Sequence, residues 1–256
     1  MGSLFGDGAA CPHFGTRRFF RDKGMVSLTM TKSEVPIQNS GFSPPFTARP
    51  DPARGGPAVG EVTVAHGWQP YYTPQGVDDP PWKHRRPEWT QYQTWQKVFG
   101  TSGTIQGGVF QRVSAQVGDV LTLVVRACFT SNQAGVALRV GIDPFGGTDF
   151  QSSEVQWGGW QGESAPKDDP GYWQGGLENP RSLSVENIEA EAPYVTLFLH
   201  IENLYAGKDE SAFWDRAELY REGGTPGPGP GPGPDGDLVK VLVQIRDVLT
   251  QIRDKL

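Results

Sequence analysis

The chain has 256 residues, and its 34 glycines and 22 prolines suit many short strands joined by turns better than long helices. Its formal net charge is −6, and it has no basic stripe, which argues against nucleic acid or an anionic membrane as a partner. Two cysteines, Cys11 and Cys128, are too few for a disulfide scaffold or a cysteine-rich zinc site, and no apolar run is long enough for a membrane-spanning helix.

The N-terminal segment, residues 1–34, is polar and basic, and we expect a flexible arm there. It lacks the apolar core of a secretory signal peptide and is interrupted by charged residues. Met25 and Met30 follow, so residues 1–24 have a second interpretation as an over-long start.

Residues 35–222 alternate apolar and polar side chains with a period of two. The alternation is clearest in 119–129, 136–142 and 194–202, and no helical period interrupts it. Further strands are expected at 61–66, 106–113, 152–157, 181–189 and 212–220. Eight or nine such strands separated by Gly, Pro, Asn and Asp turns predict an all-β fold, and specifically a jelly-roll β-sandwich.

Residues 223–236, "GGTPGPGPGPGPDG", predict a linker. Proline favours an extended chain and glycine loosens it. Collagen requires glycine at every third position, so the period of two excludes a collagen-like segment.

Residues 237–256 predict an amphipathic helix, because "VLVQIRD" (241–247) is followed directly by "VLTQIRD" (248–254). This seven-residue repeat is typical of a coiled coil, so we expect self-association, with a trimer slightly favoured over a dimer. The alternatives are a helix packed on its own domain or docked on a different protein. The expected oligomerisation seam consists of Leu238, Leu242, Ile245, Leu249, Ile252 and Leu256.

The stretch "GIDPFGGTD" (141–149) has a composition that could suit a metal loop, a phosphate loop or a turn. It lacks the alternating oxygen ligands of an EF-hand and the Gly-Lys-Ser/Thr of a phosphate-binding loop. We therefore expect a loop between two strands, with its aspartates capping the turns. Direct contact between the loop tip and a ligand is the alternative.

Aromatic residues gather in two loop-rich stretches, 67–89 and 156–176. Exposed tryptophans beside Gln, Asp and Glu suit sugars, because a sugar ring offers an apolar face for stacking and hydroxyls for hydrogen bonds. The competing interpretation is that these aromatics pack the loops themselves. The candidate carbohydrate-binding residues are Tyr72, Trp82, Trp89, Trp157, Trp160 and Trp173.

Sequence motifs for catalysis are missing. Glu88 and the pair Asp168 and Asp169 are the carboxylates that most invite a glycosidase interpretation, but no recognisable motif surrounds them. The four histidines are scattered without the spacing of a catalytic zinc site. We therefore expect neither an enzyme nor a cofactor.

Three segments resemble carbohydrate-binding modules of the galactose-binding-like class, which occur in bacterial extracellular proteins. "IQNSGFSPPF" (37–46) resembles their first strand, "GGVFQRVSAQVGDVLTLVVRACF" (107–129) their glutamine-bearing strand, and "AFWDRAELY" (212–220) their closing strand. The resemblance implies a jelly roll that binds a polysaccharide or glycan.

The same family often holds a structural calcium ion with a Glu after "GF" and Asp residues near the last strand. Here Ser43 occupies the Glu position, Asp215 remains, and Arg216 replaces the second Asp. Calcium prefers six to eight oxygen ligands, so these departures weaken the site. The alternative is that Asp215 pairs with an arginine.

Two functions follow from these patterns. The first is a non-catalytic, lectin-like carbohydrate-binding module that the C-terminal coiled coil presents multivalently. The second is a structural or adhesion subunit of a virus particle or surface appendage, whose jelly roll binds protein. The family resemblance favours the first and an extracellular or cell-surface location. The missing signal peptide favours either the second function, with a virion location, or a separate route of export.

Overall fold

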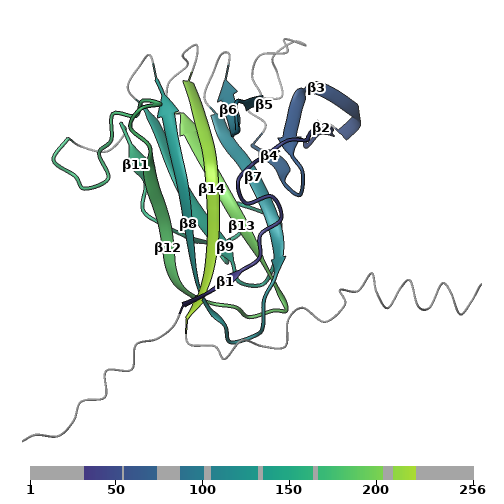
Figure 1. Ribbon diagram of the computed structural model, residues 1–256, viewed down its shortest axis with the longest axis vertical. Helices are drawn as coiled ribbons and strands as arrows, with labels where there is room; N and C mark the ends of the chain where they lie inside the picture. Colours follow the sequence, from purple (N-terminus) through teal and green to yellow (C-terminus); the bar gives the residue numbers. More distant parts are fainter. Residues whose placement is uncertain are drawn as a thin grey trace, which may run out of the picture.

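The structure is a computed structural model that describes residues 32–53, 55–73, 87–100, 105–131, 135–163, 167–203 and 210–222. These residues form fourteen strands in two sheets and contain no helix (Figure 1). Accordingly, no helix in these ranges is long and apolar enough to cross a membrane. The predicted linker 223–236, the helix 237–256, and the predicted arm up to residue 31 lie outside the described residues.

The first sheet has eight strands in the order β12-β8-β14-β6-β5-β3-β2, and β1 also pairs with β14. All its pairings are antiparallel except the one between β3 and β5, where Val62 is level with Trp89. Its strands are β1 (Lys32–Val35), β2 (Phe46–Asp51), β3 (Gly55–Ala65), β5 (Glu88–Tyr92), β6 (Trp95–Gly100), β8 (Val120–Thr130), β12 (Arg181–Glu189) and β14 (Glu210–Glu222).

The second sheet has six strands in the order β10-β9-β13-β7-β4, and β11 also pairs with β9. All of its pairings are antiparallel. Its strands are β4 (Gln69–Tyr72), β7 (Ile105–Ser114), β9 (Val136–Asp143), β10 (Gln156–Trp157), β11 (Gln161–Gly162) and β13 (Tyr194–Asn203).

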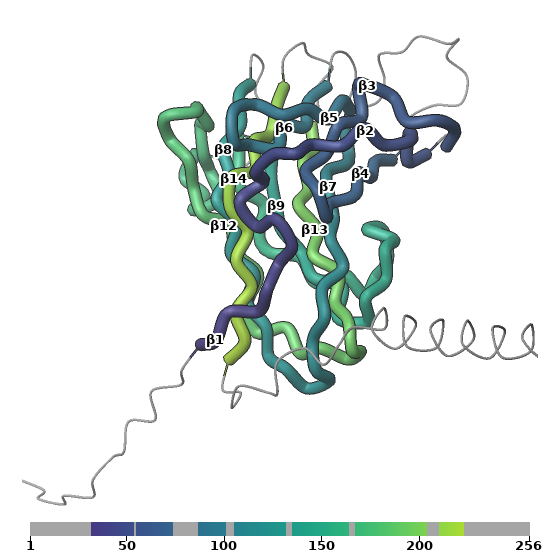
Figure 2. The backbone as a smooth tube through the Cα atoms, turned by 45° about the vertical axis from the view of Figure 1, so that its right-hand side comes forward, coloured from purple at the N-terminus to yellow at the C-terminus, as the bar shows by residue number. Residues whose placement is uncertain are grey.

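The chain crosses repeatedly from one sheet to the other. From β6 onward, β6, β8, β12 and β14 lie in the eight-stranded sheet, whereas β7, β9 and β13 lie in the six-stranded sheet. Figure 2 shows β12, β8 and β14 on one side and β13 and β7 on the other. The resulting orders, β12-β8-β14-β6 and β10-β9-β13-β7, give a jelly-roll-like β-sandwich, which confirms the all-β prediction.

The core lies between the sheets and follows the predicted alternation. Leu121, Leu123 and Val125 of β8 are fully buried, as are Leu197 and Leu199 of β13. Because side chains on a strand point alternately to opposite faces, the other residues of β13 are directed away from this core. They form the outer face of the six-stranded sheet.

The structure corrects the N-terminal strand predictions. Strand β1 includes the last residues of the segment predicted as an arm. Residues 37–45 lie outside the strands, with a turn at 38–41, and do not form the first strand of the resemblance, because the side-chain amide of Asn39 binds the backbone of Ser43. The Ser43 N–H donates to Asn39 Oδ1 at 2.7 Å, and Asn39 Nδ2 donates to the Ser43 carbonyl at 2.8 Å.

The stretch 141–149 connects strands, as predicted. Asp143 Oδ1 accepts the Phe145 N–H at 2.8 Å, and Asp149 Oδ1 accepts the Gln151 N–H at 3.0 Å. The following strand is shorter than the predicted 152–157, because Ser152 to Glu154 continue the turn and only Gln156–Trp157 pair with β9. The aspartates of this loop are therefore used as turn caps.

Candidate functional site

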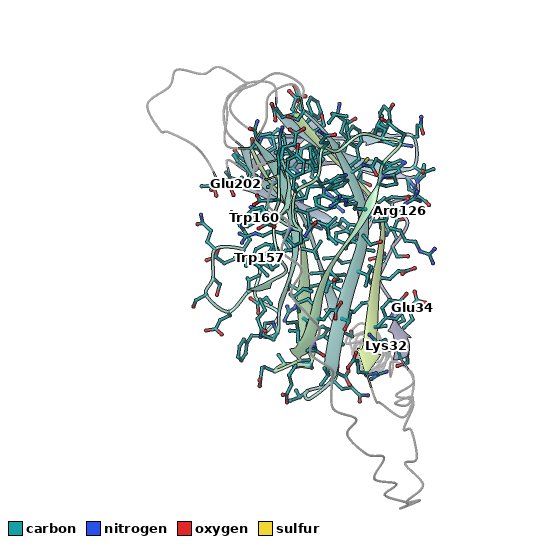
Figure 3. The ribbon with its side chains drawn as sticks, turned by 90° about the vertical axis from the view of Figure 1, so that its left-hand side faces the viewer. Lys32, Glu34, Arg126, Trp157, Trp160 and Glu202 are labelled. Atoms are coloured by element: carbon teal, nitrogen blue, oxygen red, sulfur yellow. The ribbon has the colours of Figure 1, made fainter. Side chains whose placement is uncertain are left out.

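The outer face of the six-stranded sheet carries a continuous aromatic cluster, which we call the aromatic face. Figure 3 shows Trp157, Trp160 and Glu202 on this side of the sandwich and Arg126 on the opposite side. The strand register brings these side chains together, because His200 of β13 is level with Arg139 of β9 and with Gly108 of β7. The aromatic face consists of Tyr71, Phe110, Arg139, Phe150, Trp157, Trp160, Phe198 and His200.

Two glycines allow large rings to lie against the sheet. A Cβ atom at Gly141 would lie 2.6 Å from Cε3 of Trp157, the residue paired with it across β9 and β10. A Cβ atom at Gly108 would collide with the Leu199 carbonyl oxygen and lie 3.2 Å from the Tyr71 hydroxyl. Both positions therefore require glycine for the aromatic face to keep this arrangement.

The centre of the aromatic face is a buried, uncharged pair formed by Tyr71 and His200. Their rings stack with centroids 5.9 Å apart, and the Tyr71 hydroxyl lies 3.1 Å from Nδ1 of His200. The same hydroxyl donates to the Leu199 carbonyl at 3.2 Å. Burial, together with the smaller effect of the Arg139 charge, lowers the pKa of His200 to about 3, and burial raises the pKa of Tyr71 well above its usual value. Both rings are therefore neutral at pH 7.

Arg139 lies between two indole rings above this pair. Its guanidinium carbon is 4.0 Å from the ring centroid of Trp157 and 4.0 Å from that of Trp160. No described residue accepts a hydrogen bond from it, and its Nε is shielded from solvent. Burial lowers the pKa of Arg139, while coupling to the Tyr71 hydroxyl and to the Glu202 carboxylate raises it. The stacked cation thus has no hydrogen-bond acceptor among the described residues.

A pair of polar side chains, Glu202 and Gln106, borders the aromatic face. Gln106 Nε2 donates to Glu202 Oε1 at 2.8 Å, and the two residues are level across β7 and β13. Both side chains are partly exposed. Arg139 donors, Glu202 oxygens and the Gln106 amide therefore lie near partly exposed indoles, an arrangement that can stack a ring and bond its hydroxyls.

The predicted binding residues separate into three groups. Trp157 and Trp160 belong to the aromatic face, and Trp82 lies outside the described residues. Tyr72, Trp89 and Trp173 are buried in the core, so their rings have no face open to a ligand. These three assignments are therefore corrected, because the rings pack within the core.

Each buried ring has an internal polar partner. Trp89 Nε1 donates to the Gly108 carbonyl at 2.9 Å, and Trp173 Nε1 donates to the Asn179 carbonyl at 3.2 Å. The Tyr72 hydroxyl donates to Asp51 Oδ1 at 3.0 Å. Large aromatics are tolerated inside a core when their polar atoms are satisfied in this way.

Sequence reasoning missed Arg139, Glu202, Gln106, Phe110 and Phe150 as members of the site. Phe198 and His200 share one face of β13 by alternation, but their neighbours depend on pairing between distant strands. The alternation of β9 places Arg139 opposite to the core residues Leu138 and Val140. That alternation was the one local signal that could have marked Arg139 as a surface residue.

The residues present do not fit the calcium site that the resemblance implied. The Asp215 carboxylate pairs with Arg126, whose Nη1 lies 2.9 Å from Oδ2. Arg216 pairs instead with Glu218, at 2.6 Å. Across the described ranges, no group of three or more His, Cys, Asp or Glu residues could hold a metal ion. Asp215 therefore acts as an arginine partner.

Comparison with known proteins gives structural likenesses only. No protein-family model matches the sequence, and no curated protein matches it significantly. The Stig cyclase Fisc from Fischerella sp. TAU is 14% identical, with 76% of this chain and 100% of that chain covered and a TM-score of 0.40. TmCBM61, solved in complex with β-1,4-galactotriose, is 12% identical, with 61% and 90% covered and a TM-score of 0.38.

A third structure is the CBM22-1 xylan-binding domain of Paenibacillus barcinonensis Xyn10C. It is 11% identical, with 62% of this chain and 87% of that chain covered and a TM-score of 0.33. Two of these three structures are carbohydrate-binding modules. At such low identities and TM-scores they assign no ligand to this chain.

Proposed function

We propose that this protein is a non-catalytic carbohydrate-binding protein and that the aromatic face binds a glycan. The observation that supports this proposal is the position of Arg139, which is stacked between Trp157 and Trp160 without an acceptor among the described residues. Glu202 and Gln106 add an acceptor and an amide beside it. A pyranose ring can stack on an indole while its hydroxyls bond these side chains.

A glycan suits this face better than a purely apolar ligand. The guanidinium group of Arg139 has no acceptor among the described residues, and because its Nε is shielded from solvent, a ligand would reach its terminal N–H groups. These groups lie beside an aromatic surface that is neutral at its centre. Sugar hydroxyls accept hydrogen bonds and offer C–H faces, so one ligand class meets both demands.

The positions of the carboxylates on this sheet face support a binding role over hydrolysis. Asp143 is level with Thr196, and Glu202 lies six residues further along β13, which separates them by about 20 Å. Glycosidases place their two carboxyl groups roughly 5–10 Å apart. Asp143 is also buried and engaged as a turn cap.

The first test is a glycan-array screen of the intact chain beside Trp160→Ala. We expect the intact chain to bind at least one glycan and the variant to lose at least tenfold in affinity. Trp95→Ala is the matched control, because Trp95 is a partly buried tryptophan beside Arg126 on the opposite sheet, with 5.8 Å between the ring centroid and the guanidinium. Equal losses in both variants, or no binding by a folded protein, would favour the alternative of a structural or adhesion subunit.

Multivalent presentation by residues 237–256 is part of the same proposal. The repeat in that segment predicts self-association, and several copies of a weak sugar site gain affinity when they are joined. Deletion of residues 223–256 should reduce the mass measured by light scattering to that of a monomer. An unchanged mass after deletion would remove the coiled coil from the proposal without touching the aromatic face.

A further inference from the structure

We propose that the glycan bound by the aromatic face is acidic, and that Arg139 recognises the carboxylate of a uronic acid residue. This inference rests on the proposed function and adds the class of sugar. It follows from the way in which Arg139 differs from Arg126, Arg216 and Arg221 of the opposite sheet.

Three arginines of the eight-stranded sheet have carboxylate partners within the protein. Arg126 pairs with Asp215 at 2.9 Å, Arg221 with Asp119 at 3.2 Å, and Arg216 with Glu218 at 2.6 Å. Arg139 is partly buried, yet it forms neither an ion pair nor a hydrogen bond with any described residue. Its contacts are the two indole rings, so its charge has no internal counter-ion at bonding distance.

The stacking holds the guanidinium group in a fixed orientation. Two rings at 4.0 Å from the guanidinium carbon restrict its rotation. A guanidinium group held in this way can donate two parallel hydrogen bonds along one edge, which matches the geometry of a carboxylate. A hydroxyl group cannot accept both of these parallel hydrogen bonds as a carboxylate does, so a neutral sugar leaves more guanidinium donors unpaired.

The partial burial of the Arg139 cation also favours an anion beside it. Partial burial makes the cation costly, as the lowered pKa of Arg139 shows, and a ligand carboxylate would offset that cost. Glu202 is the acidic group whose charge acts on Arg139, but it lies beyond ion-pair distance and its Oε1 already accepts from Gln106. Glu202 is therefore placed to accept from the hydroxyls of the same sugar rather than to neutralise Arg139.

The test compares oligogalacturonate with its methyl ester, which keeps the backbone and removes the charge. Isothermal titration of the full chain should give at least tenfold tighter binding of the acid, with affinity that falls as salt rises. Arg139→Gln should abolish this preference, and Arg139→Lys should restore part of it, because lysine keeps the charge without the planar edge. Thermal melting of each variant confirms that it is folded.

Arg112→Gln is the matched control for charge. Arg112 is exposed on the same sheet face, stacks on Tyr194 at 4.8 Å, and lies four residues away from Arg139 in register, or about 13 Å along the strand. The substitution Arg112→Gln should leave the preference for the acid over the methyl ester unchanged.

The outcomes separate the two proposals. Equal affinity for the ester and the acid would overturn the acidic ligand but leave the carbohydrate-binding function standing. The same conclusion would follow if the wild type and Arg139→Gln bound neutral galactan equally well. If oligogalacturonate, alginate, hyaluronan, galactan and xylan all fail to bind the folded chain, the carbohydrate-binding function is overturned as well.

Discussion

Between pH 7 and pH 4 the free energy of unfolding should fall by roughly 3 kcal/mol through His200 alone. His200 is buried, and burial lowers its pKa from 6.5 to about 3, with Arg139 as the second cause. The unfolded chain binds a proton at this histidine below pH 6.5, whereas the folded chain does so only near pH 3. Stability therefore rises with pH across the window from about 3 to 6.5 and is lost as the pH falls through it.

The measurement is urea unfolding of the wild type and of His200→Gln at a series of pH values. The variant should be less stable at pH 7, because it loses the contact with Tyr71, but its curve should fall less steeply towards pH 4. His66→Gln is the control, because His66 is exposed and solvated in both states. Parallel curves for the wild type and His200→Gln would contradict the buried neutral imidazole.

Trp89→Ala should destabilise the protein by roughly 3–5 kcal/mol, the usual cost of truncating a large core aromatic. Trp89 is fully buried, contacts Tyr72 with ring centroids 5.9 Å apart, and donates to the Gly108 carbonyl. The truncation leaves a cavity and a buried carbonyl without its partner. Guanidinium unfolding at pH 7 measures the change directly.

Trp160→Ala is the matched comparison, because both residues were predicted to bind sugar. Trp160 is partly exposed and rests on Arg139 and His200 at the surface. Its loss should cost about 1 kcal/mol or less in stability while it weakens glycan binding. A large loss of stability from Trp160→Ala, or a small one from Trp89→Ala, would reverse the assignment of core and surface.

The fold was largely predictable because the alternation is local. Leu121, Leu123 and Val125 recur at every second position, and this period alone predicts a strand with one buried face. The short strand β4 was missed because Pro70 interrupts a stretch that also carries turn residues. Strand β5 was missed because Trp89 was interpreted as a loop aromatic.

The site was less predictable because it depends on register. Arg139, His200 and Gly108 are far apart in the sequence and become neighbours only through the pairing of β9, β13 and β7. Composition cannot distinguish Trp173, which is buried against Phe129, from Trp160, which stacks on Arg139. Both tryptophans lie in the same glycine-rich stretch, and only the path of the chain determines which ring is exposed.

The most direct test of the aromatic face is to follow the indole N–H resonances of the eight tryptophans by NMR during titration with the strongest-binding array glycan. Trp157→Phe and Trp160→Phe assign their two resonances. We predict that these two shift with the glycan, while those of the buried Trp68, Trp89 and Trp214 do not. Shifts confined to Trp95, on the opposite sheet, would contradict glycan binding at the aromatic face.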